Sequence, residues 1–157
     1  MFITSAIAKD HLRIAGDDGA DDLDLKSAAA EQAVVDYLDR AVFADQAALV
    51  TAVAQVPGRL AAAKLACLEA TAAAQLVADM DLRQSEQAYA EEVYLKAAFA
   101  AARTRRGILI NPAILSAMLL MLGDLWENRE DTAVGVSVST MPNGIYSLLV
   151  PYRHQSL

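Results

Sequence analysis

Two alanine-rich runs decide the fold, RLAAAKLACLEATAAAQLVA at residues 59–78 and SEQAYAEEVYLKAAFAAARTRR at residues 85–106. Alanine loses no side-chain entropy in a helix, so each run predicts a helix. Small residues recur on one face of each run, and such faces let two helices approach closely. Because only a short connection around Asp79-Met80-Asp81 separates the runs, we expect an antiparallel helical hairpin at residues 58–106.

The remainder of the chain is also typical of helices. Alanine fills 33 of the 157 positions, against 7 Gly and 4 Pro, and this balance nearly excludes an all-β sandwich. The helix predicted from Asn111-Pro112 to about Glu130 is apolar on most sides, which is typical of a core helix or of one covered by a neighbouring subunit. The predicted helices are residues 4–14 with Thr4 or Ser5 as N-cap, Asp21 or Asp22 to Val42, residues 45–56 ended by Pro57-Gly58, and Asn111-Pro112 to about Glu130.

The region after Glu130 carries a different pattern. Val134, Val136 and Val138 alternate with small residues, which predicts a short β-strand. A turn at residues 141–144, one helical turn at 145–150 and an extended tail at 151–157 complete the chain. The expected fold class is all-α: one domain, a small helical bundle built from residues 3–56 and 107–150, with the hairpin as an insertion.

Charge and composition restrict the classes of function. Thirteen Lys and Arg against twenty Asp and Glu give a net charge of −7, which argues against a general nucleic-acid binder. The single cysteine, Cys67, excludes an internal disulfide and fits a reducing compartment. The first sixteen residues lack the pattern of a signal peptide, and the most apolar stretch, residues 113–122, is about half of the ~20 residues that a bilayer crossing needs. We therefore expect a soluble cytoplasmic protein with no membrane partner.

Residues with catalytic chemistry do not form a recognisable constellation. The two histidines, His11 and His154, lie near opposite ends of the chain, and His11 falls on an apolar helix face that favours a core or interface role. Cys67 lies among alanines, where packing is its expected role. Phosphate-loop, dinucleotide, zinc and calcium-loop spacings are absent. The sequence predicts no enzyme and no cofactor or metal.

Three blocks of the sequence together resemble one protein family, the head–tail connector (adaptor) proteins of tailed bacteriophages and prophages. The first block is AKDHLRI at residues 8–14, followed by Asp21-Asp22. The second is NPAI at 111–114, an apolar helix and GDLWENRE at 123–130, and the third is Pro142, Gly144, Leu148-Leu149 and PYR at 151–153. Order and spacing of the blocks agree with the family over residues 3–40 and 111–153, and the hairpin looks like an insertion relative to its shorter members.

The resemblance implies a structural role. Such adaptors are helical and form a ring, commonly a dodecamer, under the portal protein of the capsid. The ring extends the channel through which genomic DNA passes without specific binding, and it presents a surface for the stopper or tail-completion protein. The implied location is the virion neck, with the host cytoplasm before assembly. The family's C-terminal segments typically reach the portal.

Three groups of residues are candidates for this role. The tail combines a stiff residue, an aromatic ring and a fork-shaped cation, which suits insertion into a groove of the portal, although a frayed terminus is the alternative. An aromatic anchor and an edge strand could join subunits, although the anchor also suits the subunit core. Acidic side chains at the rim or lumen would repel DNA, although solvated surface has the same composition. The candidates for portal docking are Pro151, Tyr152, Arg153 and His154. The candidates for the subunit interface are Trp126, Arg129, Val134, Val136 and Val138. The candidates for the channel or rim are Asp17, Asp18, Asp21 and Asp22.

A second hypothesis comes from a different class of function. A soluble helical-bundle module that binds another protein, without catalytic activity, has the same composition and the same lack of catalytic motifs. The oligomeric state of the chain and its response to purified portal distinguish the module from the adaptor.

Overall fold

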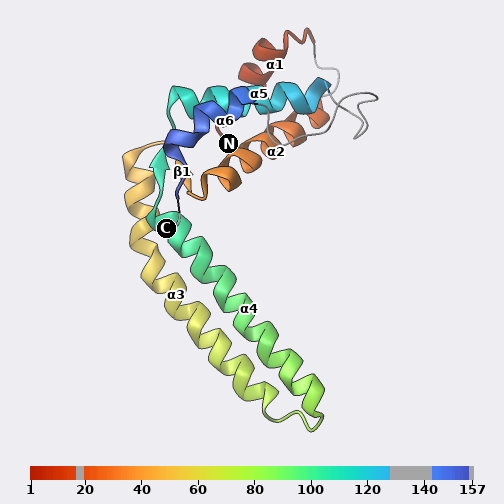
Figure 1. Ribbon diagram of the computed structural model, residues 1–157, viewed down its shortest axis with the longest axis vertical. Helices are drawn as coiled ribbons and strands as arrows, with labels where there is room; N and C mark the ends of the chain where they lie inside the picture. Colours follow the sequence, from red (N-terminus) through yellow and green to blue (C-terminus); the bar gives the residue numbers. More distant parts are fainter. Residues whose placement is uncertain (17–19, 128–142, 156–157) are drawn as a thin grey trace. The chain divides into compact units, whose positions relative to one another are not determined.

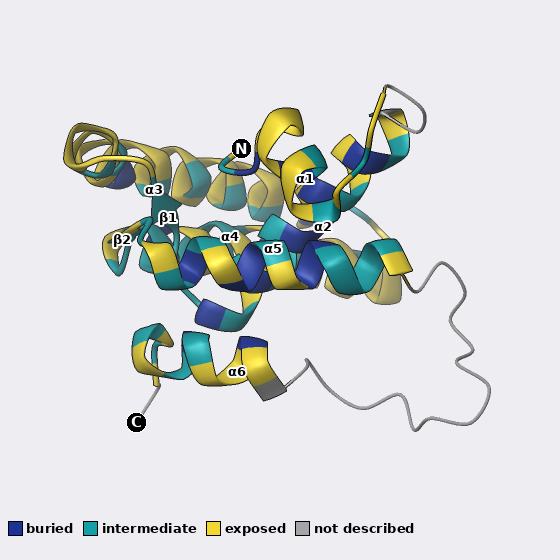
Figure 2. Cartoon of the chain, turned by 90° about the horizontal axis from the view of Figure 1, so that it is seen from above, coloured by how far each residue is buried: buried dark blue, intermediate teal, exposed yellow. Residues whose placement is uncertain are grey.

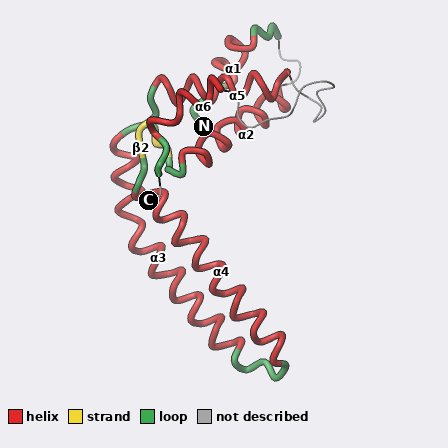
Figure 3. The backbone as a smooth tube through the Cα atoms, in the orientation of Figure 1, coloured by secondary structure: helices red, strands yellow, loops and turns green. Residues whose placement is uncertain are grey.

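The computed structural model describes residues 1–16, 20–127 and 143–155. Within them the chain is mostly helical, which confirms the expected all-α fold class (Figures 1 and 3). The elements are α1 (Ser5–Leu12), α2 (Ala20–Leu38), β1 (Val42–Phe43), α3 (Gln46–Ala74), α4 (Met80–Arg105), β2 (Ile108–Leu109), α5 (Pro112–Glu127), α6 (Asn143–Leu149) and the 3₁₀ turn η1 (Val150–Tyr152). The short strands β1 and β2 pair with each other.

The chain divides into two compact units. The first, which we call the bundle unit, comprises Met1–Ala44 and Leu109–Leu157. The second is Asp45–Ile108, which we call the hairpin unit. The two parts of the bundle unit are far apart in the sequence, so the hairpin unit is a continuous segment between them.

The core of the bundle unit forms where α2 packs against α5 and α5 packs against α6. The short helix α1 contacts both α2 and α5. Figure 2 shows buried residues along α2 and α5. Ile114, Met118 and Leu122 are fully buried at a spacing of four residues, which keeps them on one face of α5. Among the described residues, the other fully buried large side chains of this unit are Ile3, Leu23, Val34, Leu38, Ile145 and Leu149.

Local capping decides where two helices of the bundle unit begin. The Thr4 hydroxyl accepts a hydrogen bond from the Ile7 amide at 3.3 Å, and the Asn111 side chain accepts one from the Ile114 amide at 3.0 Å. Each bond satisfies one of the free N–H groups in a first helical turn. The predicted caps Thr4 and Asn111 are confirmed.

The predicted end of the second helix at Val42 is wrong. Helix α2 ends at Leu38 because Asp39 adopts a left-handed backbone with φ of 50°. That conformation terminates a helix, and aspartate tolerates it better than most residues do. The chain then becomes extended, and Val42 lies in β1.

The predicted helix end at Pro57-Gly58 is also wrong, because α3 continues through Pro57. Proline removes one helical hydrogen bond, but its fixed φ near −65° is itself helical. Val56, next to it, is 2% exposed, so packing holds this turn in place. The hairpin therefore begins at Gln46 rather than at residue 58.

The antiparallel hairpin itself is confirmed, because α3 and α4 pack along each other (Figure 1). Helix α4 begins at Met80, earlier than predicted, because the Asp79 carboxylate caps it by accepting from the Leu82 amide at 2.9 Å. The buried residues of this unit all have small side chains: Val56, Ala74, Ala90 and Ala101.

The C-terminal part of the bundle unit is more helical than expected. The single turn predicted at residues 145–150 is present and extends over α6 and η1, so the predicted tail starts in a 3₁₀ turn. The strand predicted around Val136 lies outside the described residues. In the part of the chain that the structure describes, no helix combines the length and apolar character needed to span a membrane.

Candidate functional site

The C-terminal segment packs back onto its own chain. The His154 amide donates to the Leu38 carbonyl at the end of α2, at 2.9 Å. The Arg153 amide donates to the Leu149 carbonyl at 3.1 Å, which continues the hydrogen bonding of α6 into the tail. Because these bonds fix the backbone up to residue 154, the tail is not a frayed terminus there.

Tyr37 on α2 is the aromatic centre of this contact. Its ring lies 5.6 Å from the ring of Tyr146 on α6, at an interplanar angle of 65°, which is an edge-to-face pair. The Arg153 guanidinium carbon lies 4.8 Å from the centre of the Tyr37 ring, within cation–π range. Burial raises the pKa of the Tyr37 phenol, the nearby Tyr146 phenol adds to this rise, and the Arg153 cation opposes it.

The predicted docking tail keeps part of its surface accessible. Pro151 and Arg153 are exposed, whereas Tyr152 and His154 are half-buried. The guanidinium fork of Arg153 therefore has one contact on the Tyr37 ring and an open side toward solvent. A segment with this arrangement can present a cation and a rigid proline in a fixed position.

Trp126, the candidate interface anchor, contacts a cation of its own chain. The Lys26 ammonium on α2 lies 5.1 Å from the centre of the Trp126 ring and 3.2 Å from a carboxylate oxygen of Asp22. The Lys26 side chain is only 18% exposed, so the three side chains form a partly desolvated cluster. Trp126 remains half-buried, which leaves part of its ring for another contact.

The candidate rim acids differ in their surroundings. Asp21 is exposed in the first turn of α2, where a negative charge stabilises the helix dipole. Asp22 is in the same turn but pairs with Lys26. The remaining candidates of the rim and interface groups lie outside the described residues: Asp17, Asp18, Arg129, Val134, Val136 and Val138.

A shallow hollow of about 380 Å³ lies beside α5 in the bundle unit. His11, Asp124 and Glu127 line it, together with Leu120, Gly123, Gly144 and Ile145. His11 is exposed, which rules out the core role expected for it. Among residues 1–16, 20–127 and 143–155, no group of three or more His, Cys, Asp or Glu could hold a metal ion.

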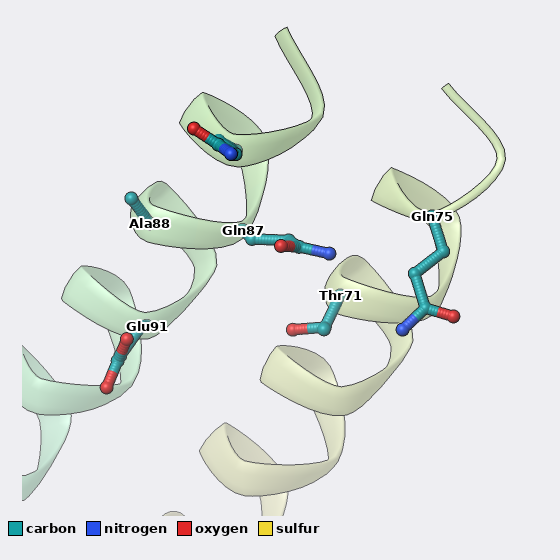
Figure 4. Close-up of a pocket in the computed structure, with 6 residues that line it drawn as sticks. Thr71, Gln75, Gln87, Ala88 and Glu91 are labelled. Atoms are coloured by element: carbon teal, nitrogen blue, oxygen red, sulfur yellow. The ribbon is translucent and has the colours of Figure 1, made fainter. Parts of the chain in front are cut away.

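The hairpin unit carries a second hollow, of about 590 Å³, near the end where α3 and α4 are joined. Figure 4 shows Thr71 of α3 and Gln75, which follows the end of α3, on one side, and Gln87, Ala88 and Glu91 of α4 on the other. Amides and a hydroxyl dominate its lining, so it lacks the convergent charges of a catalytic site. Cys67 is half-buried on α3, which is consistent with a packing role.

Sequence reasoning missed the partners of the tail and of Trp126. No sequence motif marks Tyr37, Tyr146 or Lys26 as a partner of these residues. Periodicity identifies the buried face of one helix, and it does not tell which distant aromatic or cation meets that face.

Comparisons with known proteins find no matching family model, no matching curated protein and no matching solved structure.

Proposed function

We propose that this chain is a head–tail connector (adaptor) of a tailed bacteriophage. It forms a ring of identical subunits that docks on the portal, extends the DNA channel and offers a surface to the stopper or tail-completion protein. The single observation that carries the proposal is the presence of three family-like blocks, at residues 8–22, 111–130 and 142–153, in the order and spacing of that family.

The way these blocks fold together supports the proposal. All three belong to the bundle unit, and the long insertion between the first two folds as a unit of its own. The described parts of the blocks meet through α1, α2, α5 and α6, which contact one another. Because the hairpin folds as a unit of its own, its insertion is compatible with unchanged helix packing in the proposed adaptor core.

The geometry of the tail supports its assignment to portal docking. Arg153 is held by stacking on Tyr37, and the hydrogen bond from His154 to Leu38 fixes the backbone beside it. A pre-ordered cation loses less conformational entropy on binding than a free one does, so a fixed tail favours affinity. Under this proposal Arg153 meets a carboxylate or a backbone carbonyl of the portal.

The acidic balance of the chain is consistent with a DNA channel. A net charge of −7 and the exposed Asp21 disfavour tight contact with phosphates, which a passage for moving DNA requires. The proposal includes no catalytic step and no cofactor.

A portal pull-down tests the assignment. The full chain is compared with the Arg153→Glu variant and with Gln155→Glu, an exposed neighbour that receives the same charge. We expect Arg153→Glu to lose at least about tenfold in portal affinity, since a reversed charge replaces a charge-assisted hydrogen bond with repulsion. Gln155→Glu should retain binding.

Three outcomes contradict the proposal. The first is wild-type protein that ignores purified portal, and the second is equal binding by both variants. The third is the absence of this polypeptide from the neck in electron microscopy of intact virions. Failure to bind portal, combined with a stable monomer or dimer, favours the protein-binding module.

A further inference from the structure

The hairpin unit has too little core for two long helices. Its four buried residues include three alanines, Ala74, Ala90 and Ala101. A pair of helices that buries so little apolar surface gains little from the hydrophobic effect, which normally supplies most helical stability in proteins. An additional surface that covers the pair would provide the missing burial.

Large apolar side chains are exposed on the outside of the hairpin instead. Leu65 and Leu68 lie three residues apart on one face of α3, and Leu76 follows just after the end of this helix. All three side chains are more than half exposed. On α4, Tyr89 is 63% exposed and Phe99 is 68% exposed. Helix α3 offers little charge to solvate these faces, since Arg59, Lys64 and Glu69 are its charged residues.

Exposed apolar side chains occur on both helices of the hairpin unit. Eleven large apolar side chains of the hairpin unit are at least partly exposed by more than a third. Roughly 50–100 Å² for each gives on the order of 500–1,000 Å² over all sides of the hairpin, of which one interface covers a part. A standard protein–protein interface buries about 800 Å² on each partner.

Charge along the hairpin identifies the partner. The half nearest the loop between the helices, residues 61–92, contains six acidic and two basic residues, a net charge of −4. The other half, residues 45–60 and 93–108, contains five basic residues and one acidic residue, a net charge of +4. We call these halves the acidic tip and the basic base.

The helix dipole accounts for part of this polarity only. Asp81 lies in the first turn of α4, and Arg103 and Arg105 lie in its last turn, where such charges stabilise a helix. Glu86, Glu91, Glu92 and Lys96 lie between these end turns, where the effect of the dipole has fallen off. Glu92 and Lys96 pair with each other at 2.6 Å, one helical turn apart across the boundary between the two halves. The remaining polarity of this central stretch rests on Glu86 and Glu91.

We infer that the hairpin unit binds a second copy of itself in antiparallel orientation. Two antiparallel hairpins place the acidic tip of each beside the basic base of the other, and their apolar faces cover one another. Helix α3, with 29 residues, is about 43 Å long, so the centres of the two halves are about 20 Å apart. This separation exceeds the Debye length of about 10 Å, so, apart from the Glu92–Lys96 pair at their boundary, the charges of the two halves of one hairpin interact weakly with each other.

The inference does not rest on the proposed function. A two-fold contact between hairpins can form whether or not the bundle units assemble into a ring, and it is measured on the free chain without portal. Loss of portal binding and loss of hairpin association are therefore separate observations.

Charge reversal in the full chain tests the inference. One variant reverses the acidic tip (Glu86→Lys, Glu91→Lys, Glu92→Lys), and the matched variant reverses the basic base (Arg59→Glu, Lys96→Glu, Arg105→Glu); all six side chains are exposed. Sedimentation over about a hundredfold range of concentration measures self-association. We expect a wild-type dimer, at least about tenfold weaker association of each variant alone, and a mixed dimer when the variants are combined.

Disulfide cross-linking tests the antiparallel orientation of the two hairpins in variants that keep the wild-type charges. In a Cys67→Ser background, one variant carries Gln75→Cys at the tip and another carries Gln46→Cys at the base. Mixing them should give more disulfide dimer than either gives alone, because antiparallel hairpins bring tip and base together. A monomeric wild type, undiminished association of both charge variants, or preferred tip-to-tip cross-links overturns the inference.

Discussion

Truncation of Leu122 in α5 gives the sharpest test of the bundle core. Leu122 is fully buried, whereas Leu120, two residues earlier on the same helix, is 44% exposed. The change Leu122→Ala loses about 2 kcal/mol of transfer free energy and leaves a cavity, for a total cost of about 3 kcal/mol. Leu120→Ala makes the same chemical change at the surface and should cost about 0.5 kcal/mol or less.

Urea unfolding followed by tryptophan fluorescence measures the difference. The single tryptophan, Trp126, lies on α5 within the bundle unit, so its signal reports this unit rather than the hairpin. With an m-value of about 2 kcal/mol/M, the midpoint of Leu122→Ala should fall by about 1.5 M. Equal midpoints for the two variants would refute the assignment of Leu122 to the inner face of α5.

Three further predictions concern buried polar groups and the backbone. Ser27 is 1% exposed, and its hydroxyl has no hydrogen-bond partner among the described residues. Because a buried hydroxyl without a partner is unfavourable, Ser27→Ala should raise the free energy of unfolding, measured by urea titration, by about 1 kcal/mol. A loss of stability in this variant contradicts the prediction. The raised pKa of Tyr37 contributes stability that is present below the ordinary value of 10 and is lost as the pH rises through the folded-state pKa. As the pH rises above 10, the stability of Tyr37→Phe should therefore decline less than that of the wild type, and identical pH profiles contradict the burial argument. Pro57→Ala restores an N–H inside α3, so it should raise the free energy of unfolding of the hairpin unit by up to about 3 kcal/mol. Thermal unfolding followed by circular dichroism measures this as a higher midpoint temperature. An unchanged midpoint contradicts the prediction, because it means that Pro57 does not destabilise the helix.

Features that depend on neighbouring residues were predictable. Thr4 and Asn111 cap helices through bonds to amides three residues later, so a short window of sequence contains the whole interaction. The alanine-rich runs predicted the hairpin for the same reason, since helix propensity is a property of single residues. The all-α class followed from composition.

Element boundaries were less predictable where packing competes with local preference. Proline usually ends a helix, yet α3 continues through Pro57 because its neighbour Val56 is buried. Helix α2 ends four residues before the expected end, because Asp39 adopts a left-handed backbone conformation that is unfavourable for most residue types. A pattern of apolar residues alone did not distinguish these outcomes.

The sequence by itself determined that the chain is helical and that its middle forms a hairpin. The tertiary structure decided which residues meet: Arg153 with Tyr37, Lys26 with Trp126, and the His154 amide with the Leu38 carbonyl. These pairs are separated by about a hundred residues of chain, and the hairpin unit lies between their members. Local propensity acts over a few residues, whereas such contacts depend on how whole helices pack, which no short stretch of sequence specifies.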